Sequence, residues 1–153
     1  EIYRCDWSSD VCSSDLSVVA NPAAAAQTEV LSSVLDMQGY DGVMFIALLG
    51  DVTATSVLTL TAKGNSASST SSPTPVTQKA TTAFTAGASD ADNLALIVDV
   101  CDPALRYIFA SLTRTTANAV VNGIVAIQYK AEYRPTTQDA TVLASAVGIG
   151  LSA

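Results

Sequence analysis

Short runs in which apolar and polar residues alternate recur along most of this chain, and they constrain its fold more than any other feature. Seven runs are predicted to be strands, at residues 29–37, 43–49, 57–63, 76–85, 94–101, 106–114 and 119–133. No long amphipathic run of helical period separates them, which argues against parallel βαβ units. The chain is therefore predicted to be all-β, an antiparallel two-sheet sandwich that is jelly-roll-like. A terminal arm would raise the count to the eight strands of a jelly roll, but alternation leaves an immunoglobulin-like wiring open.

The period of two also predicts which side chains face the core. Three of the runs are assigned inward faces, which are Leu58, Leu60 and Ala62; Leu94, Leu96, Val98 and Val100; and Ile108, Ala110 and Leu112. Residues 43–49 are apolar on both faces, as in a central buried strand. Residues 76–85 are rich in threonine and suit an edge strand. In the last run, Gly123 is expected to mark a bulge, with Val121, Val125, Ile127 and Tyr129 on one face and Gln128 on the other.

The predicted strands define a central domain with a segment on either side. Residues 29–134 are assigned to the sandwich, residues 17–28 to an N-terminal arm outside the core, and residues 135–153 to a C-terminal arm. The segment 135–153 contains too many apolar residues for a freely solvated terminus, so it is expected to complete its own sheet or to add to a neighbour's. Residues 64–75, rich in serine, threonine and proline, are expected to form a mobile loop.

The first sixteen residues differ in character from the rest. The block CDWSSDVCSSDL, from Cys5 to Leu16, resembles a translated sequencing adapter, so residues 1–16 are interpreted as non-native. The native N-terminus would then lie outside this sequence. The alternative is a secreted arm closed by a disulfide between Cys5 and Cys12.

Composition excludes several classes of function. The 153 residues include no histidine, so a Ser-His-Asp triad, a Cys-His dyad and a histidine-containing metal site are all excluded. A net charge of −7 opposes binding to a phosphate backbone, so no direct nucleic-acid partner is expected. No apolar run is long enough for a membrane-spanning helix, and no membrane partner is expected. No catalytic residue, metal or cofactor is predicted.

Two groups of acidic residues are candidate sites. Asp90, Asp92 and Asn93 begin like a calcium loop, but the glycine and glutamate that would complete an EF-hand are missing, so a solvated turn is favoured. Asp99 and Asp102 are a conceivable pair for glycoside hydrolysis, but they border a strand end where aspartate ordinarily caps a turn. Cys101 is expected to be a small, partly buried apolar residue.

Two stretches of the sequence resemble small structural proteins of tailed bacteriophages. They are AAAAQTEVLSSVLDMQGYDGVMFIALLG and LIVDVCDPALRYIFASLTRTTANAVVNGIVAIQY, and a short apolar tail follows them. The resemblance covers residues 27–133. It implies a capsid decoration or cement protein, present in many copies on the virion surface, with the major capsid protein or other virion proteins as partners. It brings no active-site residue with it.

The low charge content points independently towards protein partners, because the cores of protein interfaces are depleted in charge. A homo-oligomer or multi-copy assembly is expected. The candidate contact residues are Tyr107, Phe109, Val142, Leu143, Val147, Ile149 and Leu151. For the two aromatics, packing under a loop is the alternative to contact with another chain.

The sequence is also compatible with two other functions. One is a head fibre, tail or connector component, in which the C-terminal arm mediates ring or trimer contacts. The other belongs to a different class, a carbohydrate-binding module. Its stacking platforms would be Tyr40, Tyr107, Phe109 and Tyr133.

Overall fold

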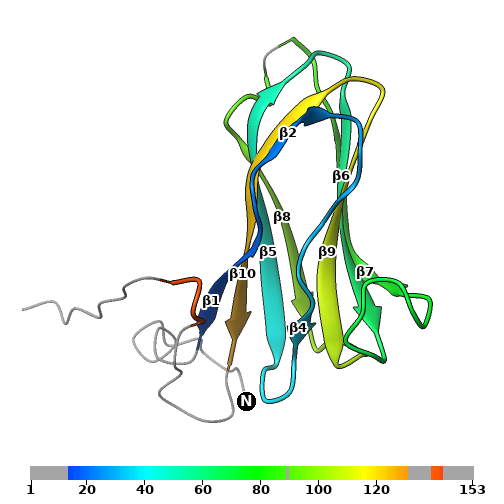
Figure 1. Cartoon of the computed structure of the whole chain (residues 1–153), viewed down its shortest axis with the longest axis vertical. Coiled ribbons are helices and arrows are strands. Elements are labelled where there is room, and N and C mark those ends of the chain that lie inside the picture. Colours follow the sequence, from blue (N-terminus) through cyan, green and yellow to red (C-terminus); the bar gives the residue numbers. More distant parts are fainter. Residues whose placement is uncertain (1–13, 89, 131–138, 143–153) are drawn as a thin grey trace, which may run out of the picture.

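The strands form two antiparallel sheets that pack face to face, in a computed structural model that describes residues 14–88, 90–130 and 139–142 (Figure 1). The first sheet has the order β1-β10-β5-β8, with β2 also paired to β10. The second has the order β3-β9-β6-β7, with β4 also paired to β9. The strand bounds are β1 Asp15–Ala20, β2 Ala23–Ala26, β3 Val30–Leu31, β4 Leu35–Asp36, β5 Gly42–Val52, β6 Val57–Asn65, β7 Val76–Thr85, β8 Ala95–Cys101, β9 Tyr107–Thr115 and β10 Ala119–Tyr129. The predicted all-β sandwich is confirmed, and the described residues contain no helix that is long and apolar enough to cross a membrane.

The pairing pattern identifies the wiring as a jelly roll. The first strand pairs with the last, the short strands β3 and β4 pair with β9, β5 pairs with β8, and β6 pairs with β7. The chain therefore runs as one long hairpin, with its tip between β6 and β7, that is rolled up into two sheets. An immunoglobulin-like wiring, which the sequence had left open, does not have this order.

The core lies between the sheets and follows the predicted alternation. Its fully buried members come from both sheets and include Val43, Phe45, Ala47, Leu58, Leu60, Ala62, Ile108, Ala110, Leu112, Ile124 and Ala126. The inward faces predicted for residues 57–63 and 106–114 are confirmed. In the run 94–101, Val98 and Val100 are buried and Leu96 is half-buried, but Leu94, which directly precedes β8, is exposed.

The predicted bulge at Gly123 is confirmed, and its effect on the strand was not foreseen. The register of β10 with β5 shifts between Val121 and Gly123, and Gly123 has a φ of +143°. Beyond the shift, Ile124, Ala126 and Gln128 face the core. The expectation that Val121 shares a face with Val125, Ile127 and Tyr129 is wrong, because the bulge exchanges the two faces of the strand.

The N-terminal segment belongs to the sandwich, which corrects its assignment as an arm outside the core. β1 and β2 both pair with β10, and Ser17 and Val19 are buried. β1 begins at Asp15, inside the segment interpreted as adapter-derived. The free edge of β10 supplies the hydrogen-bond partners that make these residues a strand.

A buried arginine holds the next part of this segment in place. The side chain of Arg114 donates to the carbonyls of Ala24 at 2.9 Å and Thr28 at 2.8 Å, to the Thr28 hydroxyl at 3.0 Å, and to the Ala119 carbonyl at 2.5 Å. Burial lowers the pKa of Arg114, but a guanidinium remains protonated at neutral pH. The bonds join β9 of the second sheet to β2 and β10 of the first.

Residues 29–37 are divided into two short strands instead of one. Between β3 and β4, the Ser33 amide donates to the Val19 carbonyl of the other sheet at 2.7 Å. The Ser32 hydroxyl accepts from the Ala110 amide at 2.8 Å. The chain thus bridges the two sheets here, which interrupts its pairing with β9.

Candidate interaction surface

The outer face of the first sheet carries apolar side chains in register across all four main strands. One row consists of Val18, Val125, Ile46 and Ile97, and the row beside it consists of Leu16, Ile127, Met44 and Asp99. Leu48 of β5, opposite Ala95 of β8, continues the surface. We call the eight residues Leu16, Val18, Met44, Ile46, Leu48, Ile97, Val125 and Ile127 the apolar face.

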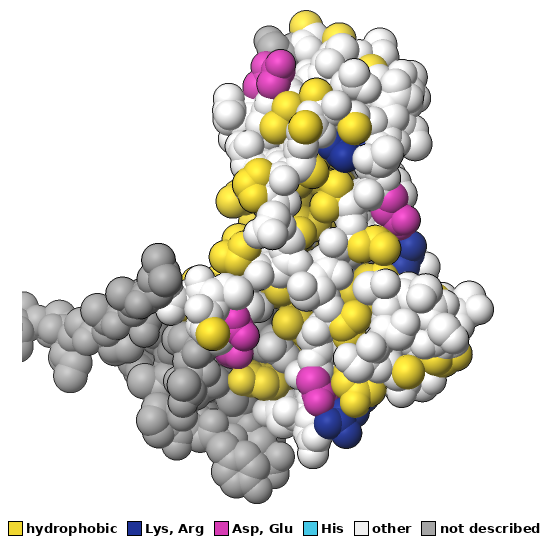
Figure 2. All heavy atoms as spheres, viewed as in Figure 1, with side chains coloured by type: hydrophobic (Ala, Val, Ile, Leu, Met, Phe, Trp, Pro, Cys, Tyr) yellow, Lys and Arg dark blue, Asp and Glu magenta, His cyan; other side chains and the backbone are white. Residues whose placement is uncertain are grey.

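The apolar face is open to solvent in the isolated chain. Ile97 is 54% exposed, Val18 45% and Leu48 42%, and Met44, Ile46, Val125 and Ile127 are half-buried. Figure 2 shows hydrophobic side chains along the side of the body on which β10 and β1 lie. The outward positions of an antiparallel sandwich are ordinarily polar. A contiguous apolar surface on a soluble protein is typical of an interaction site.

One polar cluster borders the apolar face where β8, β5 and β10 run side by side. The Tyr129 hydroxyl donates to Asp99 Oδ1 at 2.8 Å and lies 3.0 Å from Cys101 Sγ. The tyrosine ring crosses over Gly42, where a Cβ would lie 2.3 Å from the ring. Burial, followed by these hydrogen bonds, raises the pKa of Tyr129, so the hydroxyl remains a donor to the carboxylate at neutral pH. Cys101 itself is exposed, and the expectation that it is partly buried is wrong.

The contact residues predicted from the sequence do not make up this surface. Phe109 is fully buried within the chain, so it cannot contact another chain. Tyr107 is half-buried, and the Arg106 guanidinium lies 5.2 Å from the centre of its ring. Val142 is half-buried at the end of a short segment beside β1. The other four, Leu143, Val147, Ile149 and Leu151, lie outside the described residues.

The sequence did hold a signal for the apolar face. Residues 43–49 were seen to be apolar on both faces, which indicates a strand that is covered on both sides. In the sandwich, one side of β5 packs on the core and the other belongs to the apolar face. Leu16 and Val18 were missed because their segment was assigned outside the domain.

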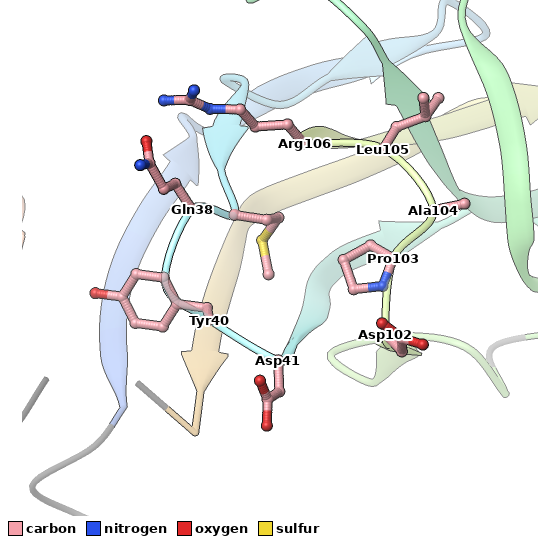
Figure 3. Close-up of a pocket in the computed structure, with 9 residues that line it drawn as sticks. Gln38, Tyr40, Asp41, Asp102, Pro103, Ala104, Leu105 and Arg106 are labelled. Carbon is pink, nitrogen blue, oxygen red and sulfur yellow. The ribbon is translucent and has the colours of Figure 1, made fainter. Parts of the chain in front are cut away.

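An open hollow of about 410 Å³ lies at one end of the sandwich (Figure 3). The turn after β4 supplies Gln38, Tyr40 and Asp41, and the connection from β8 to β9 supplies residues 102–106. Asp102 lines the hollow, whereas Asp99 is bound to Tyr129 on the outer face of the sheet. The two carboxylates considered for glycoside hydrolysis therefore belong to different surroundings.

The acidic turn considered as a calcium site uses its carboxylates to hold backbone. Asp92 Oδ1 accepts from the Val52 amide at 2.8 Å, and Asp90 Oδ1 accepts from the Gly87 amide at 2.7 Å. Over residues 14–88, 90–130 and 139–142, no three acidic, cysteine or histidine side chains come together as a metal-binding group.

The aromatic residues considered for carbohydrate stacking do not form an exposed row. Tyr40 lines the hollow, Tyr107 lies beneath Arg106, and Phe109 is buried. Tyr133 lies outside the described residues.

No protein-family model matches the chain, and no curated protein matches it.

Proposed function

We propose that this chain is a structural protein of a tailed-phage virion, most specifically a decoration or cement protein that binds the capsid shell. The apolar face is the observation that carries the proposal. It is a contiguous apolar surface on four strands, and its two rows contain one charged residue, Asp99, whose carboxylate is bound by Tyr129. The resemblance of two stretches of the sequence to phage structural proteins supports the same proposal, and so does the jelly-roll strand order.

The proposed mechanism is burial of the apolar face against neighbouring capsid subunits. Removing apolar area from water stabilises the contact, and an interface core is depleted in charge. Each contact can be weak because many copies act together on one shell. A layer bound in this way would join adjacent capsid subunits and resist the outward pressure of packaged DNA.

The test is co-expression of the full chain with the major capsid protein encoded in the same genome, followed by sedimentation of the shells. Wild-type chain is expected to sediment with the shells. Ile46→Lys, at the centre of the apolar face, is expected to weaken this binding by about a hundredfold, since a lysine in an interface core would be buried without a partner. Thr59→Lys, on an outward position of β6 in the other sheet, is the matched control and should bind like wild type.

Two results would overturn the proposal. One is wild-type chain that remains in the supernatant at every shell concentration. The other is Ile46→Lys binding as tightly as Thr59→Lys. Imaging the loaded particle by electron microscopy separates a shell position from a head-fibre, tail or connector position.

A further inference from the structure

The two edges of the first sheet differ in their hydrogen bonding. At the β1 edge, the Val18 amide donates to the Thr141 hydroxyl at 2.9 Å, and the Asp139 amide donates to Asp15 Oδ1 at 2.8 Å. The segment 139–142 therefore lies along β1. At the opposite edge, β8 pairs with β5 and with none of the other described strands.

The register shows which backbone groups of β8 point away from β5. Leu94 O accepts from the Leu49 amide, and the Asp102 amide donates to Asp41 O, both at 2.8 Å. These bonds make the even-numbered residues the hydrogen-bonded partners of β5, so the amides and carbonyls of the odd-numbered residues point outward. The outward groups belong to Ala95, Ile97, Asp99 and Cys101. Within the part of the chain that the structure describes, these backbone groups have no hydrogen-bond partner.

β8 also lacks a bulge, a proline and a lysine, three features that ordinarily protect an edge strand, and its one charged residue is Asp99, which is bound by Tyr129. Its register with β5 is unbroken, and its sequence ALIVDVC contains no proline, lysine or arginine. The edge strand of the other sheet, β7, pairs with β6 in a register that shifts between Thr61 and Lys63. Bulges and lysines are the usual means of preventing another strand from pairing with an edge. An unprotected edge is a template for strand addition.

A segment suited to this edge follows Val142. Residues 143–153, LASAVGIGLSA, contain no charged residue. Val147, Ile149 and Leu151 alternate with Gly148 and Gly150, which is the period of a strand with one apolar face. The segment starts from the β1 side of its own sheet, on which Thr141 is held.

We propose that residues 143–153 of one copy add as a strand to the β8 edge of a second copy. In its own chain the β8 edge lies three strand spacings from β1, roughly 14 Å, so the segment would have to cross the apolar face before pairing. In a neighbouring copy it can pair along its whole length. Its apolar side chains would then extend the apolar face beyond Ile97.

The arrangement is head-to-tail, because the donor leaves at β1 and the acceptor is β8, on opposite edges of one sheet. Such a contact uses two different surfaces and closes into a ring when the rotation between copies permits. The inference does not depend on the shell: it concerns contacts between copies of this chain alone.

The test is disulfide trapping between copies in a background with Cys5, Cys12 and Cys101 replaced by serine. A chain with Ile97→Cys is mixed with a chain carrying a single cysteine at position 147, 149 or 151, and the mixture is oxidised. We expect a covalent dimer in at least one mixture. Crosslinking of Ile97→Cys with itself would show that two β8 strands pair with each other, which would overturn the proposal. An intramolecular crosslink in the chain with both cysteines, without a crosslink between chains, would also overturn it.

A second measurement follows self-association without cysteines. A chain ending at Val142 is expected to associate at least tenfold more weakly than the full chain, about 1.4 kcal/mol, in light scattering coupled to size-exclusion chromatography. Its melting temperature, measured on dilute monomer, should equal that of the full chain. Unchanged association on truncation contradicts the proposal. If association is unchanged and the truncated chains still sediment with shells, strand exchange fails while shell binding stands.

Discussion

The outer faces of the two sheets differ although their inner faces are alike. Both inner faces are built mainly from buried aliphatic residues with Phe45 on β5, and each also buries a polar side chain, among them Gln128 in the first sheet and Arg114 in the second. The apolar face covers the first sheet. Five polar residues occupy outward positions of the second sheet, which are Thr59, Thr61 and Lys63 on β6 and Ser111 and Thr113 on β9; Phe109 lies on the same side of β9 but is buried. We call these five residues the polar face.

Polar side chains on the second sheet bond to each other and to nearby loops. Glu29 accepts from the Ser111 hydroxyl and from Lys63 Nζ, the latter at 3.1 Å. Thr61 and Thr81 share a hydrogen bond between their hydroxyls. A sheet in this fold can thus be completed with a polar exterior. Folding therefore does not require the apolar exterior of the first sheet. An exterior of this kind is explained by binding to another molecule that covers it.

The largest expected effect concerns Arg114, whose hydrogen bonds join the sheet that carries the apolar face to the sheet that carries the polar face. Arg114→Ala removes every hydrogen bond that this side chain makes to Ala24, Thr28 and Ala119, and leaves buried carbonyls without partners. We expect a loss of about 3 kcal/mol or more in the free energy of unfolding, measured by urea denaturation. Arg106→Ala, which removes an exposed arginine, is the control and should change stability far less. Equal losses for the two variants would show that Arg114 does not join the sheets.

The next effect tests the polar corner of the apolar face. Gly42→Ala places a Cβ 2.3 Å from the Tyr129 ring, so the ring must move off the sheet. We expect a loss of about 2 kcal/mol from overpacking, measured by thermal or urea unfolding. In a double-mutant cycle, most of this loss should disappear in the Tyr129→Ala background. Persistence of the full loss there would place the strain elsewhere.

A smaller effect is expected at Ser17, where a substitution should raise the free energy of unfolding. It tests whether β1 packs in the first sheet. The Ser17 hydroxyl faces the interior and is buried, and it has no hydrogen-bond partner among the residues that the structure describes. Ser17→Ala is expected to raise the free energy of unfolding by about 1 kcal/mol, because a buried unpaired hydroxyl is removed. Ser14→Ala, just before β1, serves as a comparison outside the core. A destabilised Ser17→Ala would mean that the hydroxyl has a partner, or that β1 does not pack as described.

The smallest effect concerns the polar face and depends on pH. The hydrogen bond from Ser111, and then Lys63, lowers the pKa of Glu29 below its ordinary value of 4.5. The folded state therefore binds this proton less tightly than the unfolded state, so the ionised carboxylate stabilises the fold above pH 4.5. This contribution is lost as the pH falls through the lowered pKa.

Glu29→Gln is accordingly expected to be slightly less stable than wild type at neutral pH. The difference should shrink as the pH falls below 4.5, in melting curves recorded across the acidic range. A difference that grows on acidification would contradict the assigned direction. No substitution on the apolar face should produce such a pH dependence, since its eight residues carry no titratable group.

Local patterns predicted several elements correctly because those elements depend on neighbouring residues alone. Alternation gave the inward faces of β6 and β9, and Gly123 gave the bulge in β10. The predictions failed where the structure of a segment depends on contacts with residues far away in the sequence. β1 was missed because its strand character depends on β10, more than a hundred residues away. Phe109 was predicted to contact another chain because it lies on the side of its strand that faces away from the core. Alternation identifies that side but does not show that other residues of the chain cover it.

The sequence by itself determined that this chain is all-β and that it has no histidine-based chemistry. It also determined where most strands begin and turn, because alternation and turn residues act within a few positions. The jelly-roll wiring and the identity of the exposed sheet face were decided only by the tertiary structure. The physical reason is that a period of two assigns each side chain to one face of its strand, whereas the strand's partner and its cover are set by contacts between distant parts of the chain.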